Sequence, residues 1–141
     1  MKTLIDTAAE AGKFASLLNA LRAAALTETL RGPGPYTLFA PTDKAFQKLP
    51  PGSLNALLKD RRKLRGILEY HLVSGAIAGK DINAGQLTTV EGGPLIVAID
   101  GVRITVNDAR VMETDIDATN GVIHVIDTLM LPTGVVLAAA A

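Results

Sequence analysis

The chain has 141 residues, enough for one domain with a substantial core, and nearly half of them are apolar. Lys and Arg balance Asp and Glu at 14 each, so no overall charge attracts nucleic acid or an anionic membrane. The absence of cysteine excludes thiol catalysis, disulfide bonds and cysteine-ligated zinc.

The first part of the chain has the periodicity of helices. Met1 to Leu4 runs directly into this pattern without the regions of a signal peptide, so we expect a cytosolic protein or one whose leader has been removed. Gly12 separates a short first helix from a longer one, whose apolar stripe consists of Phe14, Leu17, Leu18, Leu21 and Ala25. No apolar run reaches the roughly 18 residues of a membrane span, so we expect no membrane-spanning segment.

A buried strand and three further helices are predicted next. Tyr36 to Ala40 reads as the strand, and Thr42 or Asp43 is placed to cap the helix that carries Phe46. A short helix follows from Ser53. The last helix is expected to extend through 64–72, with an apolar stripe made of Leu64, Ile67, Leu68, His71 and Leu72.

The second half of the chain reads as strands. Residues 95–99 and 102–106 alternate in polarity around the hairpin signal Asp100-Gly101. A short strand is predicted at Val111-Met112, and the apolar run 122–130 predicts a strand with partners on both sides. Separate helices and mostly antiparallel strands indicate an α+β domain over 1–133. The apolar tail 134–141 either docks on this domain or is loose.

The sequence offers no recognisable catalytic or cofactor site. His71 and His124 lie within apolar runs, where a histidine usually bonds to neighbouring groups in a core, and no serine lies in a G-x-S-x-G elbow. Asp115 to Gly121 resembles the start of a calcium loop, but the twelfth position is Ile126 instead of a bidentate Glu. Turn chemistry leading into Asn120-Gly121 is the favoured alternative, and we expect neither metal nor cofactor.

One local cluster of positive charge spans residues 59–65, Lys-Asp-Arg-Arg-Lys-Leu-Arg. It could bind a polyanion such as an acidic polysaccharide. The alternative is a solvated helix start whose long side chains lie along the surface. No aromatic residue interrupts the cluster, so nucleic-acid binding is not expected.

Four segments resemble the signature segments of fasciclin-like domains. Thr37-Leu-Phe-Ala-Pro-Thr-Asp43 with Ala45-Phe46 is similar to the first signature, and Asn120-Gly-Val-Ile-His-Val-Ile-Asp127 is similar to the second. Tyr70-His71 matches the tyrosine–histidine motif between them, and Asn107 falls where the family has a hairpin asparagine. The resemblance covers nearly the whole chain, whose short loops and lack of cysteine are similar to bacterial single-domain members.

The resemblance implies a fasciclin-like fold, with N-terminal helices packed on a mostly antiparallel sheet. It also implies a non-enzymatic, exported adhesion domain that binds a cell-surface or matrix protein, with localisation in the periplasm, at the cell surface or outside the cell. It leaves the oligomeric state open. The matching structural residues are Thr42, Asp43, Asn120, Gly121, His124 and Asp127.

The resemblance also implies adhesion residues. In animal members, an acidic residue, an Asp-Ile pair and the tyrosine–histidine motif are associated with integrin-dependent adhesion, and the matching positions are Glu113, Asp115, Ile116, Tyr70 and His71. Thr114 and Asp117 depart from the proline and the apolar residue of the animal pattern, which argues against integrin recognition in particular. Alternatively, Ile116 plugs a strand, and Tyr70 and His71 belong to the core. A different function, binding of a small ligand or an acidic polysaccharide by segment 59–65, stays open.

Overall fold

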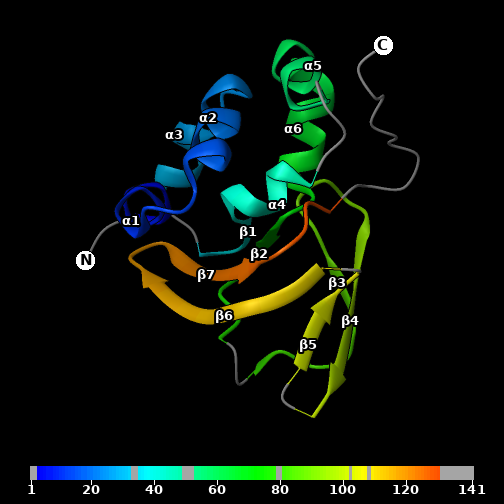
Figure 1. Ribbon diagram of the computed structural model, residues 1–141. Coiled ribbons are helices and arrows are strands. Elements are labelled where there is room, and N and C mark those ends of the chain that lie inside the picture. Colours follow the sequence, from blue (N-terminus) through cyan, green and yellow to red (C-terminus); the bar gives the residue numbers. More distant parts are fainter. Residues whose placement is uncertain are drawn as a thin grey trace.

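The structure, a computed structural model, describes residues 3–32, 35–48, 53–78, 81–101, 103–107 and 109–130, apart from the side chains of 53–55. In this part of the chain, helices cover one side of a seven-stranded sheet (Figure 1). The predicted tail 134–141, the end of the predicted domain at 133 and the predicted strand residue Val102 lie outside the described residues.

The helices form a layer above the centre of the sheet (Figure 1). Their bounds are α1 Leu4–Ala11, α2 Ala15–Ala23, α3 Thr27–Arg31, α4 Asp43–Gln47, α5 Ser53–Lys59 and α6 Arg61–Glu69. Gly12 ends α1 in the left-handed conformation, at φ 77°, as the predicted break requires. The expectation that the second helix includes Ala25 is wrong, because Ala25 has φ 60° and redirects the chain so that Leu26 and Leu30 are buried.

The sheet is mostly antiparallel, as expected. Its strands are β1 Tyr36–Pro41, β2 Leu72–Ser74, β3 Gly85–Thr88, β4 Pro94–Asp100, β5 Arg103–Val106, β6 Ala109–Ala118 and β7 Gly121–Ile126. Their spatial order is β2-β1-β7-β6-β5-β4-β3, and only β1 and β7 pair in parallel. The last strand described therefore lies beside the first, and β3, β4 and β5 turn away from the direction of β6 and β7 (Figure 1).

The neighbouring interior strands β1 and β7 are buried on both faces of the sheet. Leu38 and Ile123 contribute to a core between the sheet and the helices, whereas Phe39 and Ile126 contribute to a second core on the opposite face. The second core also contains Val97 from the β3–β4–β5 portion. Burial on both faces explains why β7 reads as a continuous apolar run, and its two partners confirm the prediction that it is an interior strand.

Three predicted element bounds are wrong. The last helix ends at Glu69, and Leu72 instead begins β2, where it pairs with Leu38. The short strand predicted at Val111-Met112 belongs to the ten-residue β6, which includes the segment expected to form a turn at 115–118. The strand predicted over 122–130 stops at Ile126. In each case strand pairing decides the outcome: Leu72 pairs with Leu38, β6 pairs with its hairpin partner β7, and β7 stops where Ile126 pairs with Pro41 at the end of β1. Local periodicity does not record such pairing.

Gly121 is required by the close approach of β7 to β1. A Cβ added at this position would lie 2.0 Å from the carbonyl oxygen of Tyr36. Tyr36 pairs with Gly121, and its N–H donates to the carbonyl of Asn120 at 3.0 Å. Any side chain at position 121 would therefore push β1 and β7 apart.

We predict that Gly121→Ala lowers the free energy of unfolding by at least roughly 3 kcal/mol, because the clash is with backbone that cannot rotate away. Gly66→Ala is the matched control: Gly66 lies inside α6, and an added Cβ would meet nothing within 4 Å. It should stabilise the protein by about 0.5–1 kcal/mol. Urea unfolding followed by circular dichroism measures both, and equal stability of the two variants would contradict the argument.

Candidate functional site

An open groove of about 620 Å³ lies where the α1–α2 connection, α4, β6 and β7 meet. It gathers residues from both signature-like segments, since Thr42 and Asp43 come from the first and Asp127 comes from the second. Glu113, one of the predicted adhesion residues, also lines it. The remaining lining residues are Gly12, Lys13, Lys44, Gln47, Lys48, Met112 and Val125.

Thr42 and Asp43 fix the helical side of the groove. Thr42 is the N-cap of α4, and its Oγ1 accepts a hydrogen bond from the N–H of Ala45 at 3.3 Å. The Asp43 carboxylate accepts the N–H of Ser16 at 2.8 Å, which caps α2 in place of Phe14, whose side chain makes no capping bond. Thr42 is therefore the cap of its own helix, and Asp43 joins that helix to the preceding one.

Asp127 fixes the end of β7 on the other side of the groove. Its Oδ1 accepts the N–H of Arg110 at 2.8 Å, which continues the contact between β6 and β7. The ammonium of Lys48 donates to the Asp127 carbonyl at 2.7 Å and lies 3.9 Å from Oδ2. The C-terminal end of α4 is thus tied to the end of β7.

Glu113 lies at the edge of the groove in an ion pair. Its carboxylate is 2.6 Å from the ammonium of Lys13, and the two side chains are 52% and 40% exposed. An ion pair this exposed is screened by water and adds at most about 1 kcal/mol to stability. The pair therefore leaves both charges accessible at the surface.

Asp115 lies in a bulge of β6. Glu113 pairs with Val125 and Ile116 pairs with Ile123, so Thr114 and Asp115 together face the single residue His124. Asp115 adopts φ 62°, and its N–H donates to Nδ1 of His124 at 3.2 Å. The bulge exposes the Asp115 side chain.

His124 supports this bulge from the interior. Its ring is fully buried and lies 5.6 Å from the ring of Phe39, centroid to centroid. Since Nδ1 accepts from a backbone N–H, Nε2 carries the proton and donates to the carbonyl of Ile77 at 2.6 Å. Ile116, next to the bulge, is half-buried and packs on the core between sheet and helices. This position fits the alternative interpretation, in which Ile116 is an apolar strand residue that packs against the core.

Tyr70 is buried, at 4% exposure, away from the groove. Its hydroxyl donates to the carbonyl of Pro94 at 2.6 Å and accepts from Nδ2 of Asn107 at 3.0 Å. The Asn107 carboxamide oxygen in turn accepts the N–H of Ile96 at 2.8 Å. This chain of bonds ties the end of α6 to β4 and to the turn before β6, which supports the core alternative for Tyr70.

His71 is fully buried beside it. Nδ1 donates to the carbonyl of Ile67 at 2.7 Å, and Nε2 accepts the N–H of Met130 at 2.9 Å, so the ring is neutral with its proton on Nδ1. Burial lowers the pKa of His71 from 6.5 to about 4, although the bond to Ile67 opposes the shift. The ring joins α6 to the chain after β7 and presents no surface to a partner.

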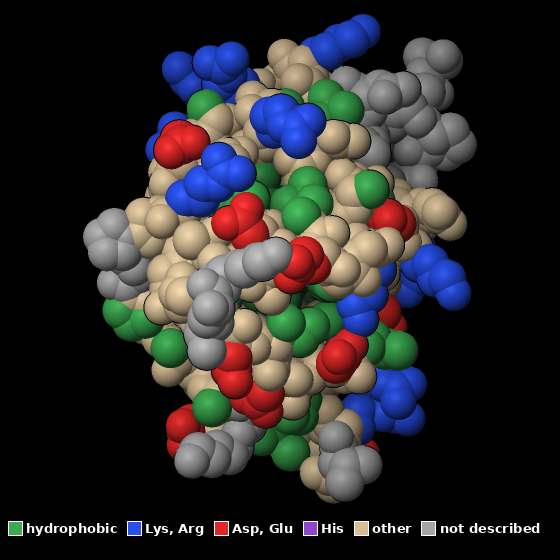
Figure 2. Space-filling view, turned by 90° about the vertical axis from the view of Figure 1, so that its left-hand side faces the viewer, with side chains coloured by type: hydrophobic (Ala, Val, Ile, Leu, Met, Phe, Trp, Pro, Cys, Tyr) green, Lys and Arg blue, Asp and Glu red, His purple; other side chains and the backbone are tan. Residues whose placement is uncertain are grey.

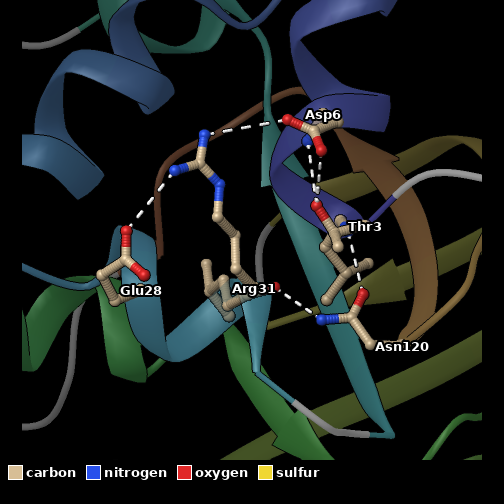
Figure 3. A network of polar contacts seen from close by, with 7 residues as sticks. Thr3, Asp6, Glu28, Arg31 and Asn120 are labelled. Atoms are coloured by element: carbon tan, nitrogen blue, oxygen red, sulfur yellow. Dashed lines mark hydrogen bonds and ion pairs between the residues drawn. The ribbon is translucent and has the colours of Figure 1, made fainter.

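Asn120 joins the start of β7 to two helices (Figure 3). Its Oδ1 accepts the N–H of Leu4, in the first turn of α1, at 2.9 Å. Its Nδ2 donates to the carbonyls of Leu30 at 2.6 Å and Gly32 at 2.9 Å, at the end of α3. One buried carboxamide therefore satisfies helix-end groups that would otherwise lack partners.

An exposed ion-pair network surrounds this anchor (Figure 3). Arg31 lies 3.4 Å from Glu28 and 3.8 Å from Asp6, and Asp6 accepts from the hydroxyl of Thr3, the N-cap of α1, at 3.1 Å. Asp6, Glu28 and Arg31 also line a surface depression, together with the apolar residues Ile5, Ala9 and Leu18. On the face where α1 and α3 lie, acidic and basic side chains alternate around apolar ones (Figure 2).

Sequence reasoning missed the residues that complete the groove. Lys13 and Lys48 carry no local signal, because each meets its partner across about 80 to 100 positions. Met112, at 57% exposure the most exposed large apolar side chain described, was predicted only as part of a short strand. Outside the groove, sequence reasoning treated Thr37 as an ordinary strand residue. Its buried hydroxyl donates to the carbonyl of Gly75 and accepts the N–H of Ile77.

No group of three or more His, Asp or Glu side chains in the described ranges could hold a metal ion. None of the described helices is long and apolar enough to cross a membrane.

Comparisons with known proteins agree on one family. The family model described as "Fasciclin domain" matches residues 12–132. The chain is 41% identical to protein sll1483 of Synechocystis, covering 92% of this chain and 73% of that protein. It is also 41% identical to transforming growth factor-beta-induced protein ig-h3 of Sus scrofa, covering 94% of this chain and 20% of that protein.

A solved structure has the same fold. The FAS1 domain pair from the insect cell adhesion molecule Fasciclin I superimposes with a TM-score of 0.81 and 23% identity, covering 92% of this chain and 51% of that chain. Fasciclin domains occur in adhesion proteins, and related proteins are extracellular or lie at the cell surface.

The anchoring role of Asn120 predicts a large effect of a small substitution. Asn120→Asp keeps an oxygen toward Leu4 but removes the donor to Leu30 and Gly32, so two buried carbonyls face a carboxylate. We expect a loss of about 3 kcal/mol or more in unfolding free energy. The control Asn19→Asp changes the same group on an exposed position of α2 and should change stability by less than about 0.5 kcal/mol. Similar losses for both variants would contradict the anchoring role.

The burial of His71 predicts that the free energy of unfolding falls at acidic pH. An unfolded histidine binds a proton near pH 6.5, but the lowered pKa of His71 keeps the folded ring neutral down to about pH 4. Its contribution to stability is therefore complete above pH 6.5 and is lost as pH falls toward 4, by roughly 2 kcal/mol between about pH 7 and pH 5. Urea unfolding should show a shallower pH dependence for His71→Gln than for wild type. An NMR titration of the folded wild type in which the His71 ring protonates near pH 6 would contradict this.

Proposed function

The chain belongs to the fasciclin domain family, and from this membership we propose that it is an adhesion domain that binds a cell-surface or matrix protein through the β6 bulge and the adjoining groove. The observation that carries the proposal is the bulge itself. Asp115 is exposed at φ 62° while its backbone is held by the buried ring of His124. A rigid support beneath an exposed charge reduces the entropy lost on binding.

The surroundings of the bulge suit a protein partner. Met112 offers an exposed apolar side chain, and Glu113 and Lys13 place one charge of each sign at the edge of the groove. Protein interfaces combine an apolar centre with a polar rim, and methionine is enriched in them. Ile116 supports this surface from below, while Tyr70 and His71 act through the fold instead of through contact.

We propose that the domain carries out no catalysis. Its adhesion relatives support this, and so do its histidines, whose ring nitrogens are all engaged with backbone groups. A general base needs a ring nitrogen that can reach a substrate proton.

We also propose that the protein works outside the cytoplasm, as its extracellular and cell-surface relatives do. One domain of this size offers a single small contact area, so adhesion would depend on many copies held on one surface. Short linkers or a shared surface raise the effective concentration of the second contact without any new residue contact.

We predict that Asp115→Asn weakens adhesion by roughly fivefold to thirtyfold, the effect of losing a contact worth 1–2 kcal/mol. Asparagine tolerates positive φ, so the bulge should persist. The assay measures retention of beads densely coated with the protein on cells of the producing organism and on a fibroblast matrix. Glu113→Gln should act in the same direction.

Asp117→Asn is the matched control, because Asp117 is an exposed carboxylate on the same strand, beyond the bulge. It should leave bead retention within about twofold of wild type. If wild-type beads bind neither surface, the adhesive function is wrong. If Asp115→Asn beads bind as well as wild type while both proteins are folded, the function survives but this site does not.

A further inference from the structure

A second surface of the molecule carries a concentrated positive charge. Lys59 ends α5, and Arg61, Arg62 and Lys63 form the first turn of α6. All four side chains are exposed, and within the described residues none of them forms an ion pair. Arg65, one turn further on, is exposed but pairs with Glu69 at 3.8 Å.

The acidic residue within this cluster does not neutralise it at close range. Asp60 is the N-cap of α6, and its carboxylate accepts the N–H of Lys63 at 3.2 Å. Segment 59–65 holds five of the 14 basic residues and one of the 14 acidic residues, so the rest of the neutral chain carries four more acids than bases. The net charge of this segment therefore attracts a polyanion, whereas the net charge of the rest of the chain does not.

The cations lie where a helix does not favour them. The N-terminal end of a helix carries partial positive charge, so each cation in the first turn of α6 destabilises the helix, most strongly at low ionic strength. Arg61, Arg62 and Lys63 therefore weaken α6, and the single Asp60 carboxylate at the N-cap stands against three cations. Lys and Arg side chains crowd the upper end of the molecule in Figure 2, the end at which α5 lies in Figure 1.

We propose that this α5–α6 surface binds an acidic polysaccharide, carboxylated or sulfated. Such a polymer repeats its negative charges along an extended chain and needs only exposed cations, which Lys and Arg clusters supply. Single-stranded nucleic acid fits less well, because the aromatic side chains described are buried or half-buried and provide no stacking platform. A membrane also fits less well, because Leu64, Ile67 and Leu68 are buried against the body of the protein and cannot insert.

This surface is distinct from the groove. None of residues 59–65 lines the groove, and its cations Lys13, Lys44 and Lys48 belong to other elements. A domain with both surfaces could hold a polysaccharide layer on one side and a protein on the other.

The test measures binding of fluorescein-labelled heparin and of polygalacturonate by fluorescence anisotropy, with neutral dextran as a blank. The variant Arg61→Gln/Arg62→Gln/Lys63→Gln is compared with Lys13→Gln/Lys44→Gln/Lys48→Gln, which loses the same charge from the groove. Wild type should bind at about 50 mM salt and bind at least roughly tenfold more weakly at 200 mM. The α6 variant should lose at least tenfold in affinity, and the groove variant should stay within twofold.

Several outcomes would overturn the proposal. These are no binding by wild type at low salt, equal losses in the two variants, or tighter binding of a single-stranded DNA oligonucleotide or of vesicles containing phosphatidylserine. Each variant is first checked by urea unfolding, and the α6 variant should be at least as stable as wild type because it relieves the helix start. The adhesion variants at Asp115 and Glu113 should bind heparin normally, so failure of one proposal is distinguishable from failure of the other.

Discussion

The parallel pairing of β1 with β7 requires two backbones to lie so close that position 121 has no room for a side chain. The rest of the structure is built around this contact. Asn120, directly before it, binds the ends of α1 and α3. Asp127, at the other end of β7, binds β6 and Lys48, the C-cap of α4. A single strand thus places the helices relative to the sheet and sets the two sides of the groove.

The buried histidines solve a related problem, because each connects backbone groups that no regular ladder can pair. His124 accepts the N–H that the β6 bulge leaves without a strand partner, and His71 accepts the N–H of Met130 after β7 has ended. Both donate their remaining ring proton to a carbonyl, and no buried side-chain nitrogen or oxygen in the described residues lacks a partner. A neutral imidazole, with one donor and one acceptor, suits such positions. The irregular backbone of the β6 bulge is therefore held in place by a buried side chain.

Much of this could be predicted from the sequence, and the limits have a physical cause. The break at Gly12, the cap at Thr42 and the interior strand β7 follow from local chemistry, and the structure has all three. The ends of α6 and β6 do not, because Leu72 pairs with Leu38, which is distant in sequence, and residues 113–117 form a bulged pairing with β7 that no periodicity reveals. Only part of the candidate site could be predicted. The family resemblance pointed to Glu113 and Asp115, whereas the groove depends on contacts between residues distant in sequence, such as Lys13 with Glu113.

The pairing of β7 with β1 also affects how the chain folds during synthesis. The N-terminal helices and β1 emerge from the ribosome first, yet β1 lacks its parallel partner until residues 121–126 have followed. Contacts so far apart in sequence form late and slow the folding reaction. Until then the apolar edge of β1 is open to pairing with other chains, a condition that favours aggregation and engagement by chaperones.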